Sequence, residues 1–409
     1  MNNIKHIARL IVAPVFIFSG FVKAIDPLGS TYKFSDYFDA FGIGFLSPMA
    51  FVLAILLSSA ELVIGLNLLF GNLMRITSWA LIIFMSFFTV LTLIIALTDP
   101  VSDCGCFGDA VILTNWQTFW KNIVFMLPTL IVFYNRKKYK PTTLLHKEWG
   151  ILFLFASVAV LISIHNYNNL PALDFRPYKI GTNIQKAMEI PEGAAKDEYE
   201  TVFIYQKGEE KKEFAIADIP YQDTAWKYAD RIDRLIKKGY EPPIHDFTLV
   251  TTDGEDITDS VLNNPGYSIL VVAYNLEKSS NKGIKAVNLF ASEAKKLGAN
   301  VYGMTASTGN TITQAAQKYN FPYDFHTCDD ITLKTIVRAN PGVLLLKNGT
   351  IIGKWHARNL PELKPDNTDF ISVALSYLQR NKSLWVRGYY LLALASLMFL
   401  LFLAVKKRQ

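Results

Sequence analysis

Charge and thiols are both scarce in this sequence of 409 residues. Only 19% of the residues are charged, below the quarter that is usual in soluble domains, while 51% are hydrophobic. The apolar residues gather in long runs over 1–165 and again over 384–405, and the stretch 166–383 has the mixed composition of a soluble protein. This distribution excludes one large soluble core and predicts a membrane protein with an inserted soluble part.

Six apolar runs are candidates for membrane helices, since a helix needs about 20 apolar residues to cross the hydrocarbon layer. We expect them at roughly 7–24, 47–70, 76–98, 118–135, 148–165 and 385–405. The run 118–135 is the weakest, because Lys121 and Pro128 interrupt it. The lipid bilayer is therefore the first expected partner.

Basic residues decide the expected orientation. The net charge of +6 does not indicate a nucleic-acid partner, because Lys and Arg cluster at the ends of the apolar runs. The loop NRKKYKPTTLLHKE after the fourth run is strongly basic, and such loops stay in the cytoplasm. We expect both termini in the cytoplasm of a bacterial inner membrane, six transmembrane helices, and the soluble part in the periplasm.

Two of the three cysteines stand one residue apart in SDCGCFGD, at Cys104 and Cys106. Their loop has no Lys or Arg and falls on the periplasmic side, where disulfides persist. Cysteines at i and i+2 can close a small, strained disulfide, which tends to oxidise other thiols. A pair that only shapes the loop stays an open alternative. A zinc site would need further ligands, and the loop has no His.

Glu61 is an acidic residue inside the second apolar run, where an acid is costly. A proton relay, a contact with a membrane quinone, or a partner for Lys23 would each give it a function. A buried polar pair that only fixes helix packing explains it equally well. Asp26 and Lys33, in the loop after the first run, are interpreted as surface or loop-fixing residues.

The soluble part changes character at about residue 240. Before that point, YETVFIYQKGEEKKEFAI predicts a hairpin that turns at Lys207–Gly208, and DTAWKYADRIDRLIKKGY predicts an amphipathic helix. After it, strand-like and helix-like runs alternate from SILVVAYN onward and end in the hairpin PGVLLLKNGTIIGKWH. This alternation predicts an α/β sheet with right-handed crossovers.

These later segments resemble the thioredoxin fold, in its peroxiredoxin and TlpA-like branch, over roughly 240–375. SILVVAYN matches the strand before the reactive cysteines of that family, and Pro341 falls where the family carries a cis-proline. No thiol follows that strand, so the family's ordinary chemistry is excluded there. Cys328, after YDFHT, is either a third thiol at the active face or a buried structural cysteine.

The membrane part resembles the DoxX and MauE-like family of four-helix membrane proteins over about 1–135. The stretches FIFSGFVKAIDPLGSTYKFSDYF, SSAELVIGLNLLFG and DCGCFGD carry this resemblance. It implies, for the MauE branch, a link to disulfide formation in periplasmic redox proteins. With the thioredoxin-like part attached, the chain resembles an arrangement found in Bacteroidota.

The expected fold is an α-helical membrane bundle, four DoxX-like helices plus two more, with an α/β thioredoxin-like soluble domain. We expect a membrane domain at 1–140, a fifth helix at 148–165, an α+β linker subdomain at 166–239, the thioredoxin-like domain at 240–380 and a sixth helix at 385–405.

Two functions follow from this organisation. The first is thiol–disulfide exchange through Cys104 and Cys106, coupled to a membrane quinone, with Cys328 as a third thiol; the protein would then be a thiol–disulfide oxidoreductase. The alternative is a non-catalytic membrane scaffold whose thioredoxin-like domain docks a periplasmic or membrane protein. The sequence leaves open whether the protein is an enzyme.

Overall fold

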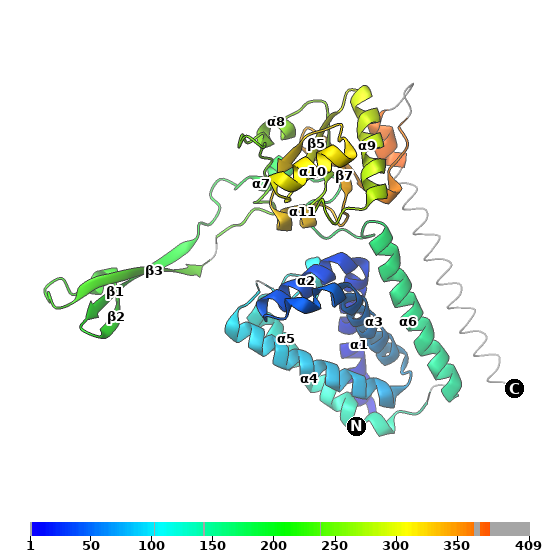
Figure 1. Cartoon of the computed structure of the whole chain (residues 1–409). Helices are drawn as coiled ribbons and strands as arrows, with labels where there is room; N and C mark the ends of the chain where they lie inside the picture. Colours follow the sequence, from blue (N-terminus) through cyan, green and yellow to red (C-terminus); the bar gives the residue numbers. More distant parts are fainter. Residues whose placement is uncertain (1, 102, 142–143, 238, 364–368, 377–409) are drawn as a thin grey trace.

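Long apolar runs become helices in the computed structural model, which describes residues 2–101, 103–141, 144–237, 239–363 and 369–376. Figure 1 shows a helical part, an α/β part next to one end of it, and a thin β arm that projects to one side. The predicted sixth helix at 385–405 lies outside the described residues.

Six α-helices form the helical part. They are α1 (Asn2–Ile25), α2 (Pro27–Ala40), α3 (Ala50–Phe70), α4 (Met74–Thr98), α5 (Asn115–Tyr134) and α6 (Leu145–Asn168), with the 3-10 turns η1 (Gly44–Met49), η2 (Gly108–Ala110) and η3 (Arg136–Lys138). Five of the helices form where the sequence predicts apolar helices. The sixth, α2, occupies residues that the sequence predicts as a loop.

Four helices among the described residues are long and apolar enough to cross a membrane: Asn3–Ile25, Gly44–Phe70, Met74–Thr98 and Leu145–Asn168. Large apolar side chains such as Ile83 and Leu97 on α4 are exposed, as expected of a surface that contacts lipid. α5 is not among the four, and its first half carries Lys121 and Asn122. Among the described residues, four helices therefore meet these criteria, and the six predicted transmembrane helices are not confirmed.

Two glycines bring α1 and α3 close together. A Cβ atom at Gly20 would lie 2.5 Å from the backbone nitrogen of Leu62, and one at Gly65 would lie 2.6 Å from the backbone nitrogen of Ile17. Small residues at such crossings let helix backbones approach each other inside a membrane. The backbones of α1 and α3 are therefore held at a short, fixed separation.

Alternating strands and helices form the α/β part, as the sequence predicts. The strands are β4 (Tyr267–Val272), β5 (Asn300–Thr305), β6 (Phe325–Thr327), β7 (Gly342–Lys347) and β8 (Thr350–His356). The helices are α7 (Ile184–Met188), α8 (Thr258–Leu262), α9 (Asn281–Lys296), α10 (Gly309–Tyr319) and α11 (Asp330–Ile336), followed later by the turn η5 (Ala357–Asn359). The strand order is β6-β5-β4-β7-β8; β4, β5 and β6 are parallel, and β7 is antiparallel to both of its neighbours.

Apolar side chains cover both faces of this sheet. One core includes Phe247 and Leu270, and the other includes Val271, Phe290 and Trp355. Successive residues of a strand point to opposite faces, which places Leu270 and Val271 of β4 in different cores. Burial on both faces explains why the sequence of this strand is a continuous apolar run.

The β arm is a three-stranded antiparallel sheet. Its strands are β1 (Glu198–Lys207), β2 (Glu210–Ala215) and β3 (Lys227–Lys237), in the order β2-β1-β3, with the turn η4 (Ile216–Asp218) after β2. The predicted hairpin at Lys207–Gly208 is confirmed. The predicted helix over 223–240 is wrong, because β3 pairs with β1 along most of its length. Strand pairing, which includes the cross-strand ion pair Lys237–Glu198, outweighs the weak helical preference of this charged segment.

Candidate functional site: a thiol pair beside a cavity between the membrane helices

Helix α2 begins directly after α1 and lies beside the loop that carries the neighbouring cysteines. Asp26 caps it, since its Oδ1 accepts a hydrogen bond from the Gly29 backbone N–H at 2.9 Å. Pro27 occupies its first turn, where the missing N–H costs nothing. These local signals start a helix at a defined residue, and the helix then directs its side chains onto the cysteine loop.

Two side chains of α2 hold this loop. The Lys33 ammonium binds the Asp103 carboxylate at 2.6 Å, and the Tyr37 hydroxyl donates a hydrogen bond to the Cys104 carbonyl at 2.7 Å. Asp103 also accepts the Gly105 backbone N–H at 2.8 Å, which tightens the turn between the two cysteines. The loop is therefore fixed by α2 and by its own backbone.

The two thiols of the loop lie against each other. Cys104 Sγ and Cys106 Sγ are 2.7 Å apart, and both cysteines are free in this structure. Gly105 between them has a φ of +63°, in the left-handed region that favours glycine. A Cβ atom there would also lie 3.2 Å from Lys33 Cγ. The Cys-Gly-Cys sequence thus brings the sulfur atoms together through a turn that needs its glycine.

A buried ion pair reaches the loop from the membrane helices. The Lys23 ammonium binds Glu61 Oε2 at 2.8 Å, and the two side chains are each 7% exposed. Lys23 also donates to Ser19 Oγ at 2.7 Å and to the Cys106 carbonyl at 2.5 Å. The three partners match the three donors of an ammonium group. Of the interpretations open for Glu61, the structure contains the pairing with Lys23.

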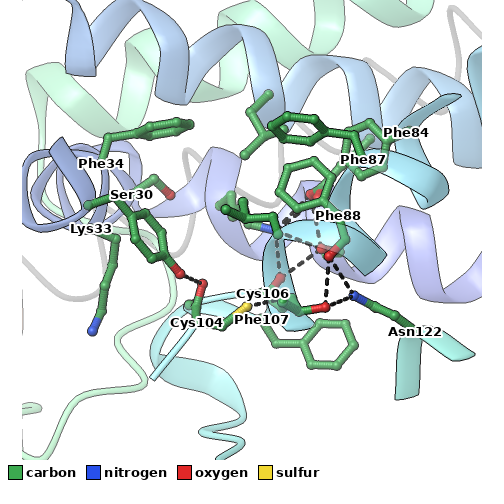
Figure 2. A pocket seen from close by; sticks show the side chains of 18 of the residues that line it. Ser30, Lys33, Phe34, Phe84, Phe87, Phe88, Cys104, Cys106, Phe107 and Asn122 are labelled. Atoms are coloured by element: carbon green, nitrogen blue, oxygen red, sulfur yellow. Dashed lines mark hydrogen bonds and ion pairs between the residues drawn. The ribbon is translucent and has the colours of Figure 1, made fainter. Parts of the chain in front are cut away.

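A cavity of about 280 Å³ lies between helices α1 to α5 and the cysteine loop. Most of its lining is aromatic or aliphatic; in Figure 2, Phe84, Phe87 and Phe88 of α4 face the loop with Cys104 and Cys106. The polar groups around it include both charges of the Lys23–Glu61 pair, together with Lys33, Lys121, Asn122 and Thr92. The thiol pair therefore borders an apolar cavity that contains a few fixed polar groups.

The surroundings separate the pKa values of the two thiols. The hydrogen bond with Cys104 lowers the pKa of Cys106 to about 6, and the charges of Lys121 and Lys23 add to this effect, whereas burial opposes it. The pKa of Cys104 is raised, first by the same hydrogen bond and then by burial. These opposite shifts favour the thiolate form of Cys106 over that of Cys104. A thiolate is the nucleophile in exchange, and a thiol of low pKa is the better leaving group.

The α/β part has no thiol where a thioredoxin-like fold would carry its reactive pair. Ser279 Oγ lies 3.0 Å from Asn340 Oδ1, and Asn340 Nδ2 donates to the Asn275 carbonyl at 2.7 Å. The Asn340–Pro341 peptide bond is cis. Ser280 caps α9 by accepting the Gly283 N–H. Hydrogen-bonded serine and asparagine side chains thus occupy the position of the reactive thiol pair.

Cys328 lies in the core of the α/β part with Phe247 and Leu333 and is 4% exposed. Burial raises its pKa to about 11. The structure therefore places the third thiol in a different core from Cys104 and Cys106, which line the membrane cavity. A buried, protonated thiol reacts poorly in exchange. Among the residues that the structure describes, no three His, Cys, Asp or Glu side chains gather as a metal site.

Sequence reasoning missed two residues of this region, Ser19 and Arg338. Ser19 precedes Lys23 by four residues, and this spacing places both on one face of α1, a signal that could have found it. Arg338 binds Asp26 across 312 positions, which no local pattern reveals. Asp26, expected at the surface or as a loop-fixing residue, has a side chain that is 19% exposed and paired with this arginine.

Residues 1–135 match the family of the methylamine utilisation protein MauE. The match spans α1 to α5 and includes the cysteine loop, which confirms the MauE-like resemblance of the membrane part. A second match relates residues 199–238, the β arm, to a domain of unknown function (DUF8463). No curated protein matches the chain.

The α/β part is similar to solved thioredoxin-like and peroxiredoxin structures. The thioredoxin domain of a thiol-disulfide oxidoreductase from Bacteroides vulgatus is 15% identical, over 26% of this chain and 81% of that one, with a TM-score of 0.23. Peroxidoxin BcpB from Mycobacterium tuberculosis is 14% identical, over 34% and 94%, with a TM-score of 0.24. A thioredoxin-like protein from Aeropyrum pernix is 17% identical, over 27% and 81%, with a TM-score of 0.23.

The fold rests on the strand order of the α/β part itself, with three parallel strands followed by an antiparallel hairpin. The chain thus combines a MauE-like membrane part with an α/β part of thioredoxin-like strand order.

Proposed function

We propose that this protein is a membrane thiol–disulfide oxidoreductase, in which Cys104 and Cys106 oxidise a client dithiol and pass the electrons to a membrane quinone. The observation that carries the proposal is the position of the pair. Both cysteines line an apolar cavity between the membrane helices, and the cavity also borders the buried Lys23–Glu61 ion pair. A pair that only shaped its loop would have no need of such a cavity.

The two cysteines have different roles in the oxidation of a client. A client thiolate attacks Cys104 Sγ of the disulfide form, the Cys104–Cys106 bond breaks, and Cys106 leaves as the thiolate. The positive charges of Lys121 and Lys23, which lower the pKa of Cys106 independently of Cys104, make it the better leaving group. The second client thiolate then attacks the client sulfur of the mixed disulfide and releases Cys104. The client departs with a disulfide, and both of its electrons remain on the reduced pair.

A quinone would return the reduced pair to the disulfide by accepting two electrons and two protons. The residues present fit such a group. The cavity of about 280 Å³ is close to the lower end of ligand pockets, which hold about 300–1,000 Å³. Phe84, Phe87 and Phe88 offer ring faces for stacking. Lys121 and Lys23 place positive charge near Cys106, where it stabilises the thiolate that donates electrons.

The proposed orientation places the cysteine loop in the periplasm and both termini in the cytoplasm of a bacterial inner membrane. The basic turn η3 (Arg136–Lys138) follows the end of α5, whereas the cysteine loop precedes its beginning. The proposal includes α5 as a further span, although it is not one of the four helices above. Positive loops face the cytoplasm, so the cysteines, at the other end of α5, lie on the opposite side. The α/β part contacts the cysteine end, because Arg338 binds Asp109 at 2.8 Å.

A trapping experiment tests this function. Replacing Cys106 by Ala leaves Cys104 able to attack a client disulfide, which releases one client sulfur as a thiolate and gives a mixed disulfide that Cys106 can no longer resolve. We expect the Cys106→Ala protein to accumulate a covalent adduct in cells, which disappears on reduction. Cys104→Ala is the matched control and should give no adduct of this kind. Absence of any adduct with Cys106→Ala, together with unchanged growth, would refute the redox function.

The scaffold alternative is supported by the Ser279–Asn340 contact, which fills the position of the missing thiols. A scaffold would keep its function when all three cysteines are replaced by Ser, whereas the oxidoreductase would lose it. The same triple variant therefore separates the two functions in a growth or client-oxidation assay.

A further inference from the structure

Arg338 belongs to the α/β part, and its side chain binds carboxylates of the membrane part. It follows α11, and its side chain is 6% exposed. The guanidinium Nε lies 2.9 Å from Asp26 Oδ2, and Nη2 lies 2.8 Å from Asp109 Oδ2. Nη1 donates to the Lys334 carbonyl at 2.6 Å, which fixes the orientation of the group. One buried arginine thus binds two carboxylates on the other part of the chain.

The two carboxylates belong to the elements that frame the cysteine pair. Asp109 lies in η2, three residues after Cys106. Asp26 caps α2, the helix whose Lys33 and Tyr37 hold the other side of the cysteine loop. Arg338 therefore binds one end of the cysteine loop directly, at Asp109, and acts on the other end indirectly, through Asp26 and α2.

The surface of α2 is shaped to receive this contact. A Cβ atom at Gly29 would lie 2.5 Å from Asp26 Oδ2 and 2.8 Å from Arg338 Nη2, so a larger residue there would have to displace this ion pair. Tyr32 packs edge-on against Tyr274 with ring centroids 6.2 Å apart, and the Arg338 guanidinium lies 5.3 Å from the Tyr32 ring. In Figure 1, α2 and α11 lie at the boundary between the two parts.

The docked face is the one that carries the cis-proline. Asn340–Pro341 follows Arg338 by two residues, and Tyr274 lies just after β4, where the reactive pair of a thioredoxin-like protein would begin. The α/β part thus directs its cis-proline face, which carries no thiol at the position of the reactive pair, toward the membrane part, which carries Cys104 and Cys106.

We propose that Arg338 docks the α/β part onto the membrane part and thereby holds α2 over the cysteine loop, so that docking sets the access of large thiol reagents to Cys104 and Cys106. Arg338 is a positioning residue in this scheme, because it acts through α2 and Asp109. The access claim stands on the contacts above and needs no redox activity. Its meaning for client selection rests on the function proposed above.

The test compares two maleimides on the reduced, full-length protein in lipid nanodiscs: N-ethylmaleimide and a large polyethylene-glycol maleimide. Site-resolved mass spectrometry gives the labelling rate at each cysteine. In Arg338→Met we expect the large reagent to label Cys104 and Cys106 about tenfold faster than in the unchanged protein, as local opening allows. Arg338→Lys keeps the charge but loses the forked geometry, and should restore part of the protection.

The chain supplies its own controls. Buried Cys328 reports on the α/β core, and it should stay protected if Arg338→Met releases the docking without unfolding. Arg234→Met, which removes an exposed ion pair with Glu213 on the β arm, should leave all three rates unchanged. Unchanged rates at Cys104 and Cys106 in Arg338→Met, with Cys328 protected, would overturn the proposal.

If Cys328 also becomes labelled in Arg338→Met, the double variant Asp26→Asn/Asp109→Asn decides. It removes both carboxylates from the membrane side and leaves the α/β core intact, and Asn remains a good N-cap for α2. Faster labelling of Cys104 and Cys106 in this variant supports the docking role. Rates equal to those of the unchanged protein refute it, and neither result depends on quinone or client chemistry.

Discussion

The chain contains two places where a redox pair could reside, and they differ in what surrounds them. At the start of α9 the thioredoxin-like scaffold keeps a cis-proline and a capped helix N-terminus, but Ser279 and Asn340 bond to each other where thiols would be. In the loop before α5, two thiols lie 2.7 Å apart beside a cavity and near the ammonium of Lys23. The scaffold alone therefore does not determine where the chemistry lies.

Removing the sulfur atoms tests this contrast most strongly. We expect Cys104→Ser or Cys106→Ser to lower the rate of quinone reduction by dithiothreitol about a hundredfold or more, because neither electron transfer nor disulfide formation remains. Cys328→Ser should leave the rate little changed, since that thiol is buried in the other core. Absorbance of a short-chain quinone measures the rate in purified protein. If Cys328→Ser were as inactive as the other two variants, the redox reaction would not be confined to the cysteine loop, and the contrast between the two places would be wrong.

Lys23→Met should have the next largest effect, on stability. It leaves the Glu61 carboxylate buried without its cationic partner, with only the Ser19 hydroxyl as a donor, which costs about 3–5 kcal/mol. Thermal unfolding in detergent measures the loss, and the double variant Lys23→Met/Glu61→Met should recover most of it. Lys207→Met, which removes an exposed ion pair on the arm, should lower the unfolding temperature far less, because solvent screens such a pair. Equal losses for the two lysines would show that burial of the pair is unimportant.

The two kinds of thiol should also differ in pH dependence. A thiolate reacts and a thiol does not, so alkylation accelerates as the pH rises through the pKa. Cys106, with a pKa lowered to about 6, should reach half of its maximal rate near that pH. Cys328, with a pKa raised to about 11, should stay slow through neutral pH. Replacing Cys104 by Ala removes the largest cause of the shift and should move the Cys106 profile to higher pH.

The smallest effect is expected at the position that has lost its thiols. Ser279→Ala removes a hydroxyl contact to Asn340 and should cost about 0.5–1.5 kcal/mol. Quinone reduction should not change, because this side chain lies outside the cavity. Chemical denaturation of the full chain and the activity assay above give the two values. A strong loss of activity without unfolding would mean that the scaffold position still takes part in the reaction.

Much of this architecture is predictable because it rests on local patterns. Apolar runs give α1 and α3 to α6, and the alternation of strands and helices gives the α/β sheet. The thiol pair and Glu61 are conspicuous because their residue types are rare in their settings. The segment 223–240 shows the limit, since its pairing with β1 is decided by a neighbouring strand and not by its own sequence.

Helix α2, which lies beside the cysteine loop, is not predicted from the sequence either, because its conformation also depends on contacts with other segments. α2 has the sequence PLGSTYKFSDYFDA, whose mixed polar and aromatic residues fit a loop as well as a helix. The contribution of Lys33 and Tyr37 becomes evident only in the fold, where both side chains contact the cysteine loop. The contact between Arg338 and Asp26 joins residues that are distant in the chain, and it forms only once both parts are folded.

The glycine contacts between α1 and α3 have a mechanical consequence. Where Gly20 and Gly65 let backbone meet backbone, no side chain remains that could change rotamer and let the helices slide. The backbone positions that carry Lys23 and Glu61, on these same two helices, are therefore held at a fixed separation. The two helices therefore form a rigid unit. Any movement that accompanies formation or cleavage of a Cys104–Cys106 disulfide has to take place in the cysteine turn and in α2, which lie against this unit.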